Sequence, residues 1–247
     1  MKRADPHSDG LVHGGSPWLS IVIPVLDEAQ TLATALALLQ PLRARSVEVI
    51  VVDGGSRDGS AGIARPFADQ VLESARGRAL QMNVGARAAR GSVLIFLHAD
   101  TRLPPAADDA IRAGLQRSGC RWGRFDVRFS GDRCVLRLVA FLMNQRSRLT
   151  GIVTGDQAMF VRRAIFEKVG GFPPLALMED VALSARLKRE GPPLCLRPRV
   201  VTSSRKWERE GALRTIWLMW RLRLAFFCGA DPGDLARRYY RGDGQLP

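Results

Sequence analysis

Histidine is scarce in this sequence, and its scarcity excludes several kinds of active site. Only three histidines occur among 247 residues, and two of them, His7 and His13, lie near the amino terminus. A zinc site built from several histidines is therefore excluded. A Ser-His-Asp triad would have to use His98, and no G-x-S-x-G elbow accompanies it.

Glycine loops that bind phosphate are also absent. The sequence has no G-x-x-x-x-G-K-[ST] loop and no G-x-G-x-x-G after its first predicted strand. Nucleotide hydrolysis on a phosphate loop and hydride transfer therefore lose their main support. The four cysteines are scattered and form no C-x-x-C pair, which is typical of reduced thiols in a cytosolic protein.

Long hydrophobic runs are missing too. No apolar run approaches the ~18 residues of a membrane span. Residues 1–17 lack the apolar core of a signal peptide, and their Gly, Ser, Asp and Pro predict a disordered tail. These features predict a cytoplasmic protein. Contact with the inner face of a membrane stays open as an alternative.

Lysine is rare, but the chain is strongly basic. Only four of the 37 basic residues are lysines, and the formal net charge is +13. A positive balance favours anionic partners such as phosphates, nucleic acid or an anionic membrane. A solvated, arginine-rich surface is the other interpretation. No nucleic-acid-binding motif accompanies the charge, so no specific nucleic-acid partner is expected.

Buried-strand runs alternate with helix patterns in the first half of the chain. The strand runs are at 19–25, 47–53, 70–74 and 93–100, and helix patterns lie between them, including 57–67 and 77–90. Such alternation predicts a parallel sheet covered by helices on both faces. Sheets of this kind bind ligands beyond the carboxyl ends of their strands.

The second half of the sequence is less regular. It predicts strands at 122–129 and 157–163 and one or two short strands within 193–204. It predicts helices at 135–148, at 179–191 and at about 211–227.

Acidic residues follow several of the predicted strands. Asp27 and Glu28 follow the first strand, Asp53 ends the second and Asp100 ends the fourth. The carboxyl ends of parallel strands share one edge, so these carboxylates converge. A divalent cation that carries a diphosphate would join them, because Mg²⁺ or Mn²⁺ accepts a few carboxylates together with substrate phosphates. Taken singly, each is equally a turn or helix-cap residue.

Four motifs in a fixed order resemble the family 2 glycosyltransferases. They are SIVIPVLDE, VVDGGSRDGS, NVGARAARGSVLIFLHAD and MED at 178–180. The likeness covers about residues 18–205. Within the family, RGRALQMNVGA together with HAD and GDQAMF resembles a bacterial subgroup labelled arsenosugar-biosynthesis glycosyltransferases.

The resemblance implies a fold and a division of the chain. The fold is α/β of the GT-A type, a Rossmann-like nucleotide-binding mixed sheet flanked by helices, with carboxyl-terminal helices after it. Residues 18–205 form the catalytic domain, with a nucleotide-binding half at 18–101 and an acceptor half at 102–205. Residues 206–247 form a helical extension.

The resemblance also implies residues that bind the nucleotide. Pro24, Leu26 and Glu28 match the opening motif that lines the nucleotide pocket. Asp53 matches the residue that contacts the base, usually uracil, and Ser56 keeps part of the turn that follows.

The sequence departs from the family pattern at two places near the nucleotide. Gly54 stands where the family often has a second Asp, which puts part of the nucleotide contact in doubt. Met82 stands where an Arg often precedes the Asn of N-x-G. The basic side chains come earlier, at Arg76 and Arg78, where they either contact the diphosphate or belong to a solvated helix start.

The HAD stretch occupies the D-x-D position of the family. Asp100 matches the ligand of the Mn²⁺ or Mg²⁺ that bridges the donor diphosphate. His98 replaces the first Asp, which commonly faces the ribose or sugar. A neutral imidazole brings no negative charge, so we expect the free enzyme to bind metal weakly. A buried position at the sheet edge is the alternative for His98.

Glu179 and Asp180 match the ED motif of the family. The general base of inverting transfer is usually the second acid, here Asp180, with Asp156 as the second candidate. Capping of a helix start is the alternative role for these acids. Asp156 and Gln157 are expected beside the donor sugar or the acceptor.

Basic and aromatic residues follow the last predicted strands. Arg205 and Lys206 precede Trp207 in a place where some processive relatives carry Q-x-x-R-W, so they are candidates for phosphate contact. The apolar helix after them either packs on the catalytic domain or lies at an anionic membrane surface.

The prediction is a metal-assisted, inverting glycosyltransferase. It moves one sugar from a nucleotide-diphosphate sugar, chiefly a UDP-sugar, to a hydroxyl acceptor. A lipid-linked or amphipathic acceptor is one alternative. One rival is a nucleotidyltransferase that makes the activated sugar. That class usually has a G-x-G-T-R-like loop, which PVLDEAQT lacks. The second rival is a non-catalytic binder of membranes or nucleic acid.

Overall fold

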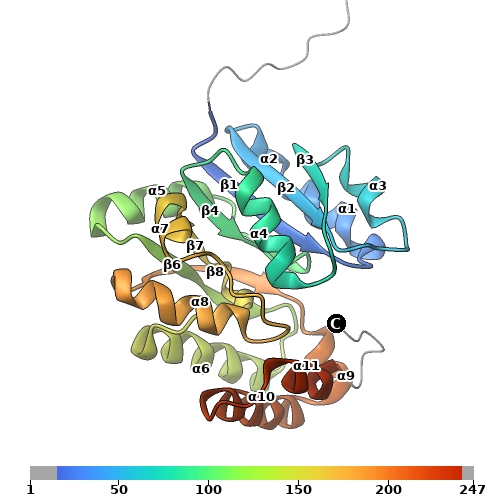
Figure 1. Ribbon diagram of the computed structural model, residues 1–247, viewed down its shortest axis with the longest axis vertical. Coiled ribbons are helices and arrows are strands. Elements are labelled where there is room, and N and C mark those ends of the chain that lie inside the picture. Colours follow the sequence, from blue (N-terminus) through green and yellow to red (C-terminus); the bar gives the residue numbers. More distant parts are fainter. Residues whose placement is uncertain (1–15, 241–247) are drawn as a thin grey trace, which may run out of the picture.

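The computed structural model describes residues 16–240 and places an eight-stranded mixed sheet at the centre of the molecule (Figure 1). The predicted tail at 1–17 lies almost wholly outside the described residues. The first half contains β1 (Leu19–Val25), α1 (Ala29–Ala37), α2 (Gln40–Arg43), β2 (Val47–Asp53), α3 (Ser60–Ala64), β3 (Gln70–Glu73), α4 (Arg78–Ala88), β4 (Val93–Phe96) and β5 (Thr101–Arg102).

The second half of the chain adds three strands, and it supplies the helices that pack below the sheet. Its elements are α5 (Ala107–Ser118), β6 (Trp122–Phe129), α6 (Cys134–Thr150), the 3-10 turn η1 (Gly155–Gln157), β7 (Phe160–Arg162), α7 (Arg163–Lys168), α8 (Glu179–Leu187), the 3-10 turn η2 (Lys188–Glu190), β8 (Leu194–Thr202), α9 (Arg205–Glu210), α10 (Ala212–Phe227) and α11 (Pro232–Tyr240).

The sheet order is β3-β2-β1-β4-β7-β6-β8-β5. Strands β1 to β4 are parallel, as predicted, whereas β7 runs antiparallel to β4 and β5 antiparallel to β8. The sheet is therefore mixed. The stretch 193–204 forms one strand, β8, which pairs in parallel with β6 across an irregularity between Phe125 and Asp126.

Alternating side chains of the parallel strands build two hydrophobic layers. Leu19, Ile21 and Ile23 of β1 face the layer that α1, α2, α3 and α5 cover. Val22 faces the opposite layer, which α4, α7 and α8 cover. This period of two is the geometry of a strand. It explains why the apolar runs are continuous, since both faces are buried.

The predicted helix at 57–67 is shorter than expected. It begins at Ser60, because Gly59 has a φ of +86° that interrupts the chain before the helix. The Asp58 carboxylate also accepts hydrogen bonds from the backbone N–H and the hydroxyl of Ser60, so it holds the turn. Strand β4 likewise ends at Phe96, which leaves His98 and Asp100 on a loop.

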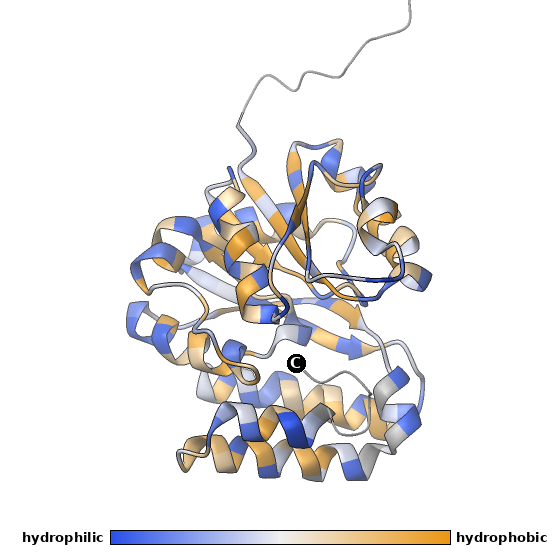
Figure 2. Ribbon diagram, turned by 45° about the vertical axis from the view of Figure 1, so that its right-hand side comes forward, coloured by the Kyte–Doolittle hydropathy of each residue, from blue (hydrophilic) through white to orange (hydrophobic). Residues whose placement is uncertain are grey.

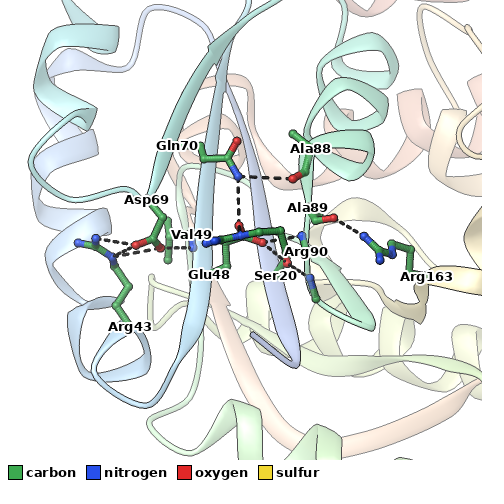
Figure 3. Close-up of polar contacts among 11 residues, drawn as sticks. Ser20, Arg43, Glu48, Val49, Asp69, Gln70, Ala88, Ala89, Arg90 and Arg163 are labelled. Carbon is green, nitrogen blue, oxygen red and sulfur yellow. Dashed lines mark hydrogen bonds and ion pairs between the residues drawn. The ribbon is translucent and has the colours of Figure 1, made fainter. Parts of the chain in front are cut away.

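A buried acidic residue closes the amino-terminal edge of the sheet, away from the carboxyl ends of β1 and β2 (Figure 3). Glu48 is only 2% exposed and accepts hydrogen bonds from the Ser20 hydroxyl, the Gln70 amide, and the backbone and side chain of Arg90. Burial alone would raise the pKa of Glu48, but these hydrogen bonds outweigh it and hold the pKa below its ordinary value.

The carboxyl-terminal helices pack below the sheet on α6 and α8 (Figure 1). Leu222 of α10 and Leu235 of α11 pack against Val181 of α8. Ile216 of α10 packs near Val139 of α6. Among residues 16–240, no helix has both the length and the apolar character needed to cross a membrane.

Candidate active site

The loops that follow β1 and β2 are joined by side chain to backbone hydrogen bonds. The Ser56 hydroxyl accepts from the Asp27 N–H at 2.9 Å, and the Asp27 carboxylate accepts from the Arg57 N–H at 2.8 Å. Asp58 accepts from the Ala29 N–H at 2.8 Å. These bonds fix the edge of the sheet where the sequence predicts nucleotide binding. Pro24 and Leu26 lie there partly buried.

Asp53 lies at the end of β2 and is 4% exposed. One carboxylate oxygen accepts from the N–H groups of Gly55 and Ser56, and the other accepts from the Ser56 hydroxyl. The carboxylate thus stabilises the turn at residues 53–56. A contact with the nucleotide base would use the lone pairs that these hydrogen bonds leave free.

Gln81 occupies the space beside Gly54, and the sequence did not single it out. Its amide nitrogen donates to the carbonyl of Val25 at 2.8 Å and to that of Val52 at 2.9 Å. A Cβ atom on Gly54 would lie 3.0 Å from the Gln81 side chain. Gly54 therefore leaves room for the buried Gln81 side chain, which joins the carboxyl ends of β1 and β2.

Three charged side chains meet near the ends of β1 and β4. The Arg205 guanidinium lies 3.9 Å from the Glu28 carboxylate. Burial raises the pKa of Glu28, and the negative charge of Asp100 adds to this rise. Glu28 and Asp100 therefore interact electrostatically, as expected if the strand ends converge. The hydroxyl of Thr31 donates a hydrogen bond to Glu28 at 3.2 Å.

His98 faces the second half of the chain. Its Nδ1 lies 3.5 Å from Oδ1 of Asp156, and only 16% of its side chain is exposed. A Cβ atom on Gly155 would lie 2.3 Å from Nε2 of His98, so the imidazole packs directly on that glycine. The loop after β4 and the turn η1 are thus in contact through His98.

Asp156 is partly exposed although protein atoms surround its carboxylate. The exposed fraction of its side chain is 39%. Burial raises its pKa, but the contact with His98 and the positive charges of Arg78 and Arg223 outweigh that effect and hold the pKa below its ordinary value. Asp156 therefore stays charged at neutral pH.

Asp180 lies at the start of α8 and is fixed by backbone donors. Its Oδ2 accepts from the Gly155 N–H at 2.7 Å, and its Oδ1 accepts from the Val181 N–H at 2.7 Å. The residue is partly exposed. Met178, which precedes the helix, has a φ of +67°. That left-handed turn starts the helix at the two acids.

Glu179 differs from Asp180 because it is buried. It is 4% exposed, and its carboxylate lies 3.8 Å from the Arg78 guanidinium. Burial raises the pKa of Glu179, and the charge of Asp180 raises it further. Arg78, predicted either to contact the diphosphate or to belong to a solvated helix start, thus reaches Glu179.

The other predicted site residues have varied positions. The Gln157 side chain is 0% exposed and donates to the Ser147 hydroxyl at 3.1 Å, so it supports η1 from inside and does not face the donor side as expected. Arg76 is exposed on the loop before α4. The side chain of Lys206 lies outside the part that the structure describes.

Two arginines beside the acids were missed at the sequence level. Arg146 of α6 and Arg223 of α10 are close enough to influence each other, and both interact electrostatically with Asp156 and Asp180. The available signal was the helical phase of the last apolar stretch, because at about 100° per residue Arg223 lies nearly opposite Arg214. Arg214 is exposed in the structure, whereas Arg223 is partly buried.

The residues suit a metal that the substrate helps to hold. Across residues 16–240, no group of three or more His, Cys, Asp or Glu side chains forms a ready metal site. A single carboxylate such as Asp100, with a second one nearby at Glu28, still fits Mg²⁺ or Mn²⁺. These ions commonly use one or two carboxylates together with substrate phosphates and water.

The fold places the protein in a known structural class. A structure titled mannosyltransferase PcManGT from Pyrobaculum calidifontis, in complex with GDP-Man and Mn²⁺, is similar with a TM-score of 0.61 and 22% identity, over 95% of this chain and 67% of that one. S. aureus TarS 1–349 in complex with UDP is similar with a TM-score of 0.62 and 15% identity, over 91% and 72%. The mixed sheet with its helices is the GT-A fold of these enzymes.

Sequence comparison then defines the family. The chain belongs to glycosyl transferase family 2, whose model matches residues 20–170. A probable glycosyltransferase, YdaM of Bacillus subtilis, is 26% identical over 84% of this chain and 54% of its own length. Glycosyltransferase AglE of Haloferax volcanii is 32% identical over 64% and 56%. The matches thus span about half the length of these relatives. The nucleotidyltransferase alternative finds no support.

Proposed function

We propose that the protein is an inverting glycosyltransferase that moves one sugar from a nucleotide-diphosphate sugar to a hydroxyl acceptor. One observation carries the proposal. A partly exposed carboxylate, Asp180, is held at 2.7 Å by the Gly155 N–H, next to the turn that contacts His98 after β4. The proposed base, Asp180, is thereby close to the loop after β4, where the donor is expected to bind.

In the proposed reaction, an acceptor hydroxyl oxygen attacks the anomeric carbon of the donor. The bond between that carbon and the diphosphate oxygen breaks, and the hydroxyl proton passes to Asp180. Attack opposite the leaving group inverts the configuration. Asp180 suits the base better than Glu179, because Glu179 is buried and its raised pKa disfavours the charged form.

For the donor, we propose a UDP-sugar whose uracil lies near Asp53 and whose diphosphate lies near Asp100. Asp100 would hold Mn²⁺ or Mg²⁺ together with the diphosphate, and the ion would neutralise charge on the leaving group. Arg76, Arg78 and Arg205 supply positive charge on the same side. The support is their position beyond the carboxyl ends of the strands.

The acceptor and cellular location are proposed from the surface. Of the ten large apolar side chains that are exposed in the described residues, four lie on α6 and four on α10. These two helices form the lower end of the molecule, where hydrophobic residues recur along them (Figure 2). An apolar surface of this kind favours contact with the cytoplasmic face of a membrane and a lipid-linked or amphipathic acceptor.

The motifs RGRALQMNVGA, HAD and GDQAMF support a finer placement, in the subgroup labelled arsenosugar-biosynthesis glycosyltransferases.

A donor screen tests the proposal without knowledge of the acceptor. The protein is incubated with UDP-sugars and with GDP-mannose, with and without Mn²⁺, and nucleotide release to water is measured. We expect release from at least one UDP-sugar and a strong loss in Asp180→Asn. If no donor is hydrolysed and calorimetry detects no nucleotide binding, the proposal fails. Release from GDP-mannose alone would overturn only the choice of UDP.

A further inference from the structure

A cavity beside the proposed base has no assigned ligand. It has a volume of about 730 Å³ and lies between α6, α8 and the end of α10. Leu149, Ile152, Val181 and Phe227 give it an apolar wall, whereas Arg146 and Arg223 add positive charge. Val181 directly follows Asp180, so the cavity adjoins the proposed acceptor side of the reaction.

The two arginines keep donors that nothing in the described chain satisfies. Nε and Nη2 of Arg146 and Nε of Arg223 are buried, and they have no hydrogen-bond partner among residues 16–240. Buried polar groups are nearly always hydrogen-bonded, so such donors call for an explanation such as a ligand. Three unsatisfied nitrogen atoms on two adjacent guanidinium groups therefore indicate an anion site.

The positive charge of the pair persists at neutral pH. Burial, with the charge of Arg223 as the second cause, lowers the pKa of Arg146 to about 10. Both arginines still carry a proton at pH 7. Two like charges in a partly buried place destabilise the protein unless an anion or a carboxylate compensates them. Asp156 and Asp180 supply part of that compensation.

We propose that this cavity binds the acceptor, and that the acceptor is an amphiphile whose head group carries the accepting hydroxyl beside a phosphate-type group. The phosphate-type group lies between Arg146 and Arg223, while the apolar chain follows Leu149 and Phe227. The inference rests on the proposed function, because it places the head group beside Asp180. Guanidinium groups suit phosphate oxygens, since they donate in a planar fork.

The apolar side chains at one end of the cavity favour an occupant with an apolar chain. The exposed side chains of Leu149 and Phe227, 86% and 67% exposed, form an apolar path from the cavity to the surface. The other exposed apolar side chains of α6 and α10 lie on the same two helices. Lys188 and Arg189 also line the cavity and add positive charge around the head group.

Decyl phosphate, used below its micelle concentration, is a suitable probe. Binding is measured by calorimetry, and the fluorescence of Trp217 and Trp220 on α10 offers a second signal. We expect decyl phosphate to bind more tightly than decyl maltoside or inorganic phosphate. The double change Arg146→Met and Arg223→Met should weaken it about 10- to 100-fold, the range for losing hydrogen bonds to a charged group.

Two controls separate binding from folding. Arg117→Met changes an exposed arginine on α5 and should leave binding of decyl phosphate unchanged. The change of both cavity arginines to Lys keeps the charge and should restore part of the affinity. The melting temperature of the Met double variant should equal or exceed that of the wild type, because two poorly satisfied buried cations are removed.

Several outcomes would overturn the inference. Equal binding of decyl phosphate and decyl maltoside, or unchanged binding by a folded Met variant, removes the anion site. Equal binding of inorganic phosphate removes the role of the apolar chain. If anionic vesicles bind but the monomeric amphiphile does not, the arginines serve a membrane surface instead. If UDP affinity falls as much as decyl phosphate affinity, they serve the donor. Failure of the proposed function would appear separately, as absent donor hydrolysis by the wild type.

Discussion

The His98 imidazole lies 3.5 Å from the Asp156 carboxylate and joins the loop after β4 to the turn η1. The contact depends on Gly155, since any side chain there would meet the imidazole. The N–H of the same glycine donates to Asp180. One short turn therefore positions a donor-side residue and the proposed base together.

Gly155→Ala should disrupt this arrangement. The new methyl group would overlap Nε2 of His98, so either the imidazole or the turn that holds Asp180 must move. We expect hydrolysis of the donor to fall about tenfold to 100-fold, since small displacements of positioned groups are costly. Steady-state kinetics with the donor found in the screen would measure this.

Gly62→Ala is the matched control for that change. Gly62 lies in α3 and is exposed, and a methyl group added there would have no neighbouring atom within 4 Å. The substitution should leave hydrolysis unchanged and stabilise the helix slightly, by about 0.5–1 kcal/mol. Equal kinetics for Gly155→Ala and Gly62→Ala would contradict the role given to the His98 contact.

Asp100→Ala should abolish metal-dependent binding of the nucleotide sugar. The structure leaves Asp100 partly exposed near Glu28, so removal takes away the main carboxylate for the ion. Nucleoside binding should survive, because Asp53 lies on a different loop. Calorimetry with UDP-sugar and with uridine, each with and without Mn²⁺, separates the two. Full turnover in EDTA would show that no metal is needed.

Asp180→Asn should lower turnover by about 10²–10⁴, the usual contribution of a general base. Asn keeps an oxygen that can accept from the Gly155 N–H, but it cannot take up the acceptor proton usefully. Donor affinity should change less than about threefold, because the lost interaction forms chiefly in the transition state. Single-turnover kinetics and calorimetry would measure both quantities.

Glu179→Gln should have a milder effect on turnover than Asp180→Asn. If Asp180→Asn keeps near-normal transfer, the base lies elsewhere and Asp156→Asn is the next variant to measure. If neither acid affects any activity, and affinity for anionic vesicles depends only on salt and the number of arginines, the protein is a binder rather than an enzyme.

Two buried glutamates should give opposite dependences of stability on pH. The pKa of Glu48 is lowered in the fold, so its ionised form stabilises the protein above the ordinary pKa, and this contribution is lost as pH falls through the folded pKa. Glu48→Gln should therefore cost about 1–3 kcal/mol at pH 7. The difference from the wild type should shrink in acid.

Glu179 provides the opposite case. Its pKa is raised in the fold, chiefly by burial, so the stability of the wild type falls as pH rises from the ordinary value through the folded pKa. Glu179→Gln removes this loss, and the variant should be the more stable protein at pH 8. Urea unfolding at several pH values measures both variants. A destabilised Glu179→Gln at pH 8 would mean that the Arg78 contact outweighs burial.

Local pattern was sufficient for much of the fold. The continuous runs at 19–25 and 47–53 predicted strands buried on both faces, and the structure confirms β1 and β2 at those bounds. Asp53 was predicted at the end of the second strand and lies there, whereas Asp100, predicted to end the fourth strand, lies on the loop after β4. The start of α3 was missed, since the positive φ of Gly59 depends on the contacts of its loop.

Pairs of residues far apart in the chain could not be found in this way. Gln157 was expected beside the donor, yet it lies inside, because its partner Ser147 comes from another helix. Gln81 of α4 was overlooked, since its two carbonyl partners belong to β1 and β2, which come much earlier in the chain.

The sequence alone determined which segments of the first half form strands and that acidic residues end or follow them. It also determined the family, through the motifs that contain these acids. These depend on neighbours within a few residues, where periodicity and turn chemistry act directly. Tertiary structure decided the rest. It brought Arg146 and Arg223 into the same cavity, and it buried Glu179 while leaving Asp180 partly exposed. Burial and charge pairing of this kind arise only when distant helices pack.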